Sequence, residues 1–195
     1  MKRKKAMSKQ ARFIENVIAE VRRREKQVAL KMFILGSRFP ENCPRRCEGC
    51  TIQGCEDASR RRLLIHDALN MGSNIVMLFE DCEAVARASV DEELILMNSE
   101  IDMVIILPES FGSVAELVDF SHNRKIYPKM RVFVKKRYHP QQGESKSYLR
   151  DFLRKFDARG GRVYWFESDD QLVKDIGNIC DYYRGSKCID QLKKI

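Results

Sequence analysis

The stretch that decides the fold is DMVIILPESFGSVAE, residues 102–116. Its first half is apolar at consecutive positions from Met103 to Leu107, which is typical of a strand buried on both faces at the centre of a parallel sheet. Pro108 and Gly112 mark a short turn, after which apolar residues recur at helical spacing to about Asn123. A buried strand that runs through a short turn into a helix is half of a βαβ unit.

The same alternation of strand and helix extends along the chain in both directions. Four further strands are predicted at 28–35, 74–79, 130–135 and 162–166, with helices at 8–27, 57–70, 112–123 and 146–158, a helical stretch before Asn98 and a last helix from Ser168 or Asp169. This order predicts a doubly wound, Rossmann-like α/β fold with a mostly parallel sheet of about five strands and helices on both faces. A length of 195 residues suits one domain, 1–195.

Composition and charge limit the classes of partner. The longest apolar run is far shorter than the roughly 20 residues of a membrane helix, and no apolar signal region follows the basic start, so we expect a cytoplasmic protein without a membrane partner. The net charge is +8, with basic clusters at 1–5, 22–24 and 60–62. No aromatic-interleaved nucleic-acid motif accompanies them, so we interpret these clusters as solvated and expect no nucleic-acid partner.

Three predicted strand ends supply the candidate ligand site, because ligands of open α/β sheets bind beyond the carboxyl ends of the strands. The candidate binding residues at these ends are Gly36, Ser37, Arg38, Glu80, Asp81, Pro108, Glu109, Ser110, Gly112 and Ser113. Glu80 and Asp81 are placed to hold ribose hydroxyls, although Asp81 is equally suited to be a helix N-cap.

The loop after the third strand has the chemistry of an anion site. Free N–H groups at a helix N-terminus favour phosphate, Gly112 permits close approach, and the hydroxyls of Ser110 and Ser113 are donors. Glu116 lies one turn into the helix, so that its carboxylate can point back toward the ligand. A purely structural alternative also fits, since Ser113 and Glu116 have the spacing of a capping box.

Residues 102–116, read as D-x5-P-x3-G-S-x2-E, resemble the signature of the SLOG/LOG superfamily. That superfamily includes the Lonely Guy-type phosphoribohydrolases, with the motif PGGxGTxxE, and is related to nucleoside 2-deoxyribosyltransferases. The resemblance implies that Gly112 and Ser113 bind phosphate and that Glu116 is the nucleophile or stabilises the oxocarbenium charge when an N-glycosidic bond is cleaved. It also implies a nucleotide or nucleoside as ligand and a homodimer, for which the apolar faces of the first and last helices leave room.

Two departures from the Lonely Guy pattern bear on the substrate. Glu109 and Ser110 stand in place of the paired glycines, and the acidic residues 91–93 stand where those enzymes carry an arginine-lysine pair. Acidic groups there would repel a 5′-monophosphate. The departures leave open a non-catalytic nucleotide-sensing module, in signalling or defence, as the alternative to an enzyme. Asp102 either assists protonation of the leaving base or is a turn residue at the opposite edge of the sheet.

Four cysteines, Cys43, Cys47, Cys50 and Cys55, crowd into the loop at 38–56 that follows the first strand, with the spacing C-x3-C-x2-C-x4-C. Four thiolates in one short loop suit tetrahedral zinc, and less well an iron–sulfur cluster. Free, reduced thiols are the alternative, and the remaining three cysteines are interpreted as structural.

Overall fold

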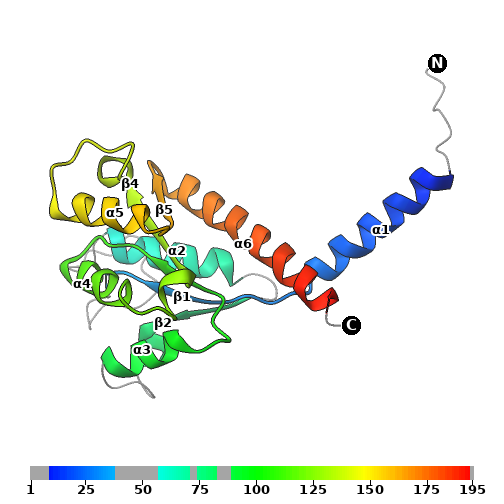
Figure 1. Cartoon of the computed structure of the whole chain (residues 1–195), viewed down its shortest axis with the longest axis horizontal. Coiled ribbons are helices and arrows are strands. Elements are labelled where there is room, and N and C mark those ends of the chain that lie inside the picture. Colours follow the sequence, from blue (N-terminus) through cyan, green and yellow to red (C-terminus); the bar gives the residue numbers. More distant parts are fainter. Residues whose placement is uncertain (1–8, 38–56, 71–73, 83–88, 194–195) are drawn as a thin grey trace.

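A five-stranded, entirely parallel sheet forms the centre of the protein (Figure 1). The computed structural model describes residues 9–37, 57–70, 74–82 and 89–193. The strands are β1 (Lys31–Leu35), β2 (Ile75–Leu78), β3 (Met103–Ile106), β4 (Met130–Lys135) and β5 (Val163–Phe166), in the spatial order β2-β1-β3-β4-β5. The predicted doubly wound α/β fold is confirmed.

Helices cover both faces of this sheet. The described helices are α1 (Lys9–Glu25), α2 (Asp57–Leu69), α3 (Ser89–Met97), α4 (Phe111–Phe120), α5 (Tyr148–Ala158) and α6 (Asp169–Leu192), with short 3-10 turns η1 (Phe79–Cys82), η2 (Tyr127–Lys129) and η3 (Lys136–Tyr138). Apolar side chains of α3, α4 and α5 pack on one face, and those of α2 and α6 pack on the other.

The central strand β3 is fully buried, as its apolar sequence predicts. Val104 and Ile106 belong to the hydrophobic core on the α4 face, whereas Met103 and Ile105 belong to the core on the α6 face. Because successive side chains of a strand alternate between faces, an uninterrupted apolar run serves both cores at once.

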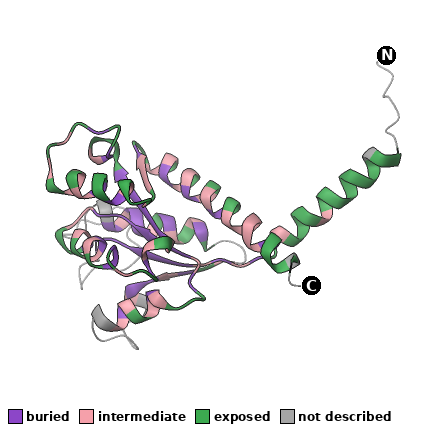
Figure 2. Cartoon of the chain, viewed as in Figure 1, coloured by how far each residue is buried: buried purple, intermediate pink, exposed green. Residues whose placement is uncertain are grey.

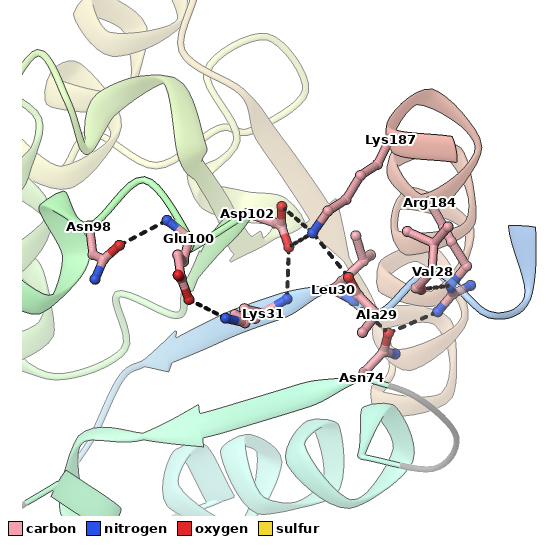
Figure 3. Close-up of polar contacts among 10 residues, drawn as sticks. All are labelled: Val28, Ala29, Leu30, Lys31, Asn74, Asn98, Glu100, Asp102, Arg184 and Lys187. Atoms are coloured by element: carbon pink, nitrogen blue, oxygen red, sulfur yellow. Dashed lines mark hydrogen bonds and ion pairs between the residues drawn. The ribbon is translucent and has the colours of Figure 1, made fainter. Parts of the chain in front are cut away.

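A polar network fastens the amino edge of the sheet to α6 (Figure 3). The Asp102 carboxylate accepts hydrogen bonds from the Lys31 N–H at 2.8 Å and from Lys187 Nζ at 2.7 Å. Lys187 also donates to the Ala29 carbonyl, and Arg184 donates to the Val28 carbonyl and to Asn74. Asp102 is therefore a structural residue at the edge opposite the carboxyl ends of the strands, as one of its two interpretations predicted.

The first helix extends away from the sheet, and its residues are mostly exposed (Figures 1 and 2). The helix itself was predicted, but its apolar residues Phe13, Ile14, Val17, Ile18 and Val21 are all exposed. Its carboxyl end lies beside α6, where the Glu25 carboxylate approaches Gly185. The homodimer that this face could serve stays a prediction.

None of the described helices has the length and apolarity that crossing a bilayer requires.

Candidate functional site

The order in which the chain adds strands to the sheet reverses between β1 and β3. The chain passes from β1 to β2 on one side and later returns to add β3 on the other, so the crevice at the carboxyl ends of β1 and β3 is the ligand position that this topology favours. Gly36 and Ser37 follow β1, Glu80 lies in η1 directly after β2, and residues 108–110 follow β3. The structure thus brings the predicted residues to one edge. Arg38 lies outside the described residues, as does the side chain of Asp81.

A buried arginine that the sequence analysis did not assign to the site connects the first two of these strand ends. Arg62 of α2 is only 2% exposed and forms an ion pair with Glu80. The same guanidinium donates to the carbonyl oxygens of Gly36 at 3.1 Å and Ser37 at 3.0 Å. A Cβ added at Gly36 would lie 2.7 Å from Arg62 Cδ, so glycine is needed here to admit the arginine rather than a ligand.

The neighbouring Arg61 connects this edge to the loop after β3. Its Nη1 donates to Glu109 at 2.5 Å and its Nε donates to Asp169 of α6 at 2.6 Å. The guanidinium also lies 5.2 Å from the centroid of the Phe166 ring. Burial works against the charge of Arg61, but the bonds to Asp169 and Glu109 outweigh it and raise the pKa of this side chain.

The prediction that the basic cluster at 60–62 is solvated was therefore wrong for Arg61 and Arg62, which are both buried. A signal was present in the sequence. Three consecutive helical residues span about 200° of the helix circumference. In a helix packed on a sheet they cannot all face solvent.

Two oxygen atoms at this edge are buried without a hydrogen-bond partner among the described residues: Ser37 Oγ and Glu80 Oε1. Ser37 is buried, and the Glu80 side chain is only 9% exposed although its other oxygen binds Arg62. Buried polar atoms in native proteins are almost always hydrogen-bonded, and an unsatisfied one costs about 1–3 kcal/mol. Ser37 and Glu80 follow the neighbouring strands β1 and β2, and an unsatisfied hydroxyl donor and carboxylate acceptor at these strand ends are suited to bind the hydroxyls of a sugar.

Helix α4 begins at Phe111, one residue before the predicted start, and its N-cap lies one turn before Ser113, the N-cap of the capping box that the sequence suggested. Ser110 is the N-cap: its Oγ accepts from the Ser113 N–H at 3.2 Å, and the Ser113 hydroxyl accepts from the Ser110 N–H at 3.0 Å. The capping box therefore pairs Ser110 with Ser113, and the predicted pairing of Ser113 with Glu116 was wrong. Both serine hydroxyls are used in this cap, and Ser113 is buried. Gly112, by contrast, is exposed and open to close approach.

Glu116 lies on the flank of α4 that faces away from α5. Glu116 is two residues from both Val114 and Val118, or about 200° around the helix, so it lies on the other flank of α4 from these two residues. Val114 and Val118 line a cavity toward α5.

The four clustered cysteines Cys43, Cys47, Cys50 and Cys55 lie outside the described residues. Within the described part of the chain, no cluster of histidine, cysteine and acidic side chains is arranged to hold a metal ion. Cys180 and Cys188 are buried free thiols, as expected of structural cysteines. Burial raises the pKa of the Cys180 thiol to about 11.

No curated protein matches the chain at a significant level. A family model described as STM3845 retron effector protein matches residues 59–195, more than two thirds of the chain, from the arginines of α2 to the end of α6. The chain belongs to the STM3845 retron effector protein family.

Proposed function

We propose that this retron effector acts in defence by cleaving an N-glycosidic bond of a nucleoside or nucleotide bound at the carboxyl edge of the sheet. The observation that carries the proposal is the pair of buried, unsatisfied oxygens, Ser37 Oγ after β1 and Glu80 Oε1 after β2, at the edge of the sheet where α4, the helix of Glu116, also begins. In this arrangement the sugar hydroxyls bind Ser37 and Glu80, and the Glu116 carboxylate approaches the anomeric carbon.

The chemistry follows from the charge that develops at C1′. When the bond to the base breaks, the base leaves with the electron pair and the sugar acquires oxocarbenium character. A carboxylate beside C1′ stabilises this cation or bonds to it; water then adds its oxygen to C1′, any bond to the carboxylate breaks, and the proton that the water loses neutralises the departed base. The likeness of residues 102–116 to the SLOG/LOG superfamily supports this choice of reaction, and we propose Glu116 as the carboxylate.

The direct test is to incubate the purified chain with a panel of nucleosides, nucleotides and NAD and to measure free base by chromatography. Release of base from at least one member supports an N-glycosidase. A panel on which no base is released, while one member binds saturably, would remove the enzyme and leave the alternative, a nucleotide sensor. The occupation of both Ser110 and Ser113 hydroxyls by the helix cap favours that alternative, because the loop then offers a ligand only its backbone N–H groups.

Ser37→Ala is expected to weaken ligand binding about fivefold without destabilising the fold. The substitution removes a buried hydroxyl that has no partner within the described residues, so the free energy of unfolding should stay the same or rise. Binding should weaken because the hydroxyl donates to the sugar, and a lost hydrogen bond is worth about 1 kcal/mol. Calorimetric titration and thermal unfolding measure the two effects separately.

The matched control is Ser121→Ala, since Ser121 is equally buried but its hydroxyl donates to the Val118 carbonyl at 2.7 Å. This variant should lose about 1 kcal/mol of stability and keep full ligand affinity. If Ser37→Ala behaves like Ser121→Ala in both measurements, Ser37 does not bind the sugar.

Zinc in the cysteine loop is a separate proposal, based on a donor set of four thiols. Elemental analysis of purified protein is expected to find about one zinc per chain. Cys47→Ser should lower this content severalfold, because a tetrahedral site that loses one thiolate binds its metal weakly, whereas Cys188→Ala should leave it unchanged. Iron in place of zinc would indicate the iron–sulfur alternative, and protein free of both metals would contradict the proposal.

A further inference from the structure

A cavity of about 700 Å³ lies on the flank of α4 opposite Glu116. Its apolar wall is formed by Val114 and Val118 of α4, Val134 of β4 and Leu149 of α5. The volume is within the range of small-molecule sites, which are concave, mostly apolar and equipped with a few polar groups. We call it the α4–α5 cavity.

Two aromatic side chains at this cavity are left in solvent. Phe111, the first residue of α4, is 93% exposed, and Tyr148, the first residue of α5, is 71% exposed. Both line the cavity. Large aromatic rings bury 150–250 Å² when they are covered, so leaving two of them uncovered at one cavity points to a ligand that covers them.

Two cations share the same cavity. Lys135, at the end of β4, and Arg137, in η3, line it, and neither forms an ion pair with any described carboxylate. By contrast, the intervening Lys136 is paired with Glu167 at 2.8 Å. The N-termini of α4 and α5 also open here, after the N-caps Ser110 and Ser147, and add positive potential. Glu109 also lines the cavity, but its carboxylate is paired with Arg61, so the two cations make this part of the cavity suited to an anion.

The Asp119 carboxylate, which lines the cavity far from the N-terminus of α4, limits the classes of ligand that fit. Asp119 lines the cavity eight residues along α4 from Phe111, a separation of about 12 Å along the helix axis. The cavity is thus longer than a phosphate ion. Its aromatic surface suits a nucleotide base, and the cations near the helix N-termini suit a phosphate. The Asp119 carboxylate, further along the cavity, suits an amino group on the base.

We propose that the α4–α5 cavity binds a nucleoside phosphate, with its base against the aromatic rings and its phosphate beside the two cations. The site is distinct from the crevice of the proposed function, because Val114 and Val118 line it and Glu116 lies about 200° around α4 from both. The two share the loop at residues 108–110. The nucleoside phosphate can be a free mononucleotide or the phosphorylated end of a single strand, which present the same groups.

The test is calorimetric titration of Glu116→Gln protein, in which turnover is blocked, with AMP, adenosine and inorganic phosphate. AMP is expected to bind saturably, and adenosine and phosphate each at least about tenfold more weakly, because each lacks half of the recognised groups. A second arm uses a 5′-phosphorylated trinucleotide, and tighter binding of this probe than of AMP identifies a strand end as the source. Absence of saturable binding of both AMP and the trinucleotide up to millimolar concentrations overturns the proposal.

Matched variants assign the binding to this cavity. Tyr148→Ala should weaken binding of AMP about tenfold, since stacking of a base on an aromatic ring contributes about 1–3 kcal/mol. Lys135→Gln should weaken it by a similar factor, since it removes a charged hydrogen bond to the phosphate. The controls are Tyr182→Ala, a tyrosine of α6 with a similar exposure of 70%, and Lys136→Gln, which should bind as the parent does. If the cavity variants bind AMP as tightly as these controls, the cavity is not the site.

The outcome is independent of the proposed function. Tyr148→Ala in the otherwise unchanged chain should leave base release intact, and Ser37→Ala should leave the Tyr148-dependent binding intact. If the cavity does not bind AMP, the proposed role of Glu116 in base release still stands. If no base is released, the proposed binding at the cavity still stands.

Discussion

Replacing Arg62 by methionine is expected to lower the free energy of unfolding by about 3–5 kcal/mol. The guanidinium is buried among the Glu80 carboxylate and the carbonyl oxygens of Gly36 and Ser37. Its removal leaves a carboxylate that is only 9% exposed without its partner, and leaves two carbonyl oxygens without their donor. Breaking a buried pair by removing one member costs far more than the pair itself contributes, because the remaining charge stays desolvated. Denaturant unfolding followed by circular dichroism measures the change.

Two further variants separate this explanation from a general loss of charge. Arg154→Met removes an exposed arginine that lies 3.9 Å from Asp151, and it should cost no more than about 0.5 kcal/mol. The double variant Arg62→Met with Glu80→Met should recover the part of the loss that comes from the unpaired carboxylate, since replacing both members of a buried pair is often neutral, while the two carbonyl oxygens stay without their donor. An Arg62→Met protein as stable as Arg154→Met would show that the network at this edge of the sheet does not hold the strand ends together.

Glu116→Gln is expected to lower the rate of base release by at least about 10³-fold while leaving thermal stability nearly unchanged. Glutamine keeps the size and shape of the side chain but removes the negative charge that stabilises the oxocarbenium ion. Substrate should still bind, because the sugar hydroxyls are held by Ser37 and Glu80 in this account. Single-turnover release of base and calorimetric binding on the same variant separate the two effects.

The control for Glu116 is Glu100→Gln, which alters an exposed carboxylate at the amino edge of the sheet, where Glu100 pairs with Lys31. That variant should release base as fast as the parent protein. Equal rates for Glu116→Gln and the parent would remove Glu116 from the reaction, whatever ligand the crevice binds.

The fold was predictable because each element follows from local sequence. The continuous apolar run of β3 serves two cores, and the short turn into α4 fixes the direction of the chain, so parallel pairing follows from few alternatives. For the ion pair between Asp102 and Lys187, the sequence indicated only that an aspartate stands at the start of a strand. Its partner lies 85 residues further along, and no local pattern indicates it.

The sequence predicted which strand ends carry the candidate residues, but not the hydrogen bonds and ion pairs that join them. Gly36, Ser37, Glu80 and the loop after β3 do meet at one edge, because parallel strands end together. Arg61 and Arg62 were missed because the helical period shows only that residues 60–62 cannot all face solvent, and no local pattern indicates which carboxylates the buried ones meet. The capping box was shifted by one turn because Ser110 and Ser113 both have the chemistry of an N-cap, and only the backbone at Ser110, extended at φ −125°, decides between them.

The central claim is that a sugar binds to Ser37 and Glu80 at the carboxyl edge of the sheet. A crystal structure of Glu116→Gln protein with the nucleoside or nucleotide that binds most tightly in the panel tests it most directly. The account predicts that hydroxyls of the sugar lie within hydrogen-bonding distance, about 2.5–3.2 Å, of Ser37 Oγ and Glu80 Oε1, with the anomeric carbon facing residue 116. A crevice between β1 and β3 that stays empty of ligand, with Ser37 and Glu80 unchanged, would contradict it.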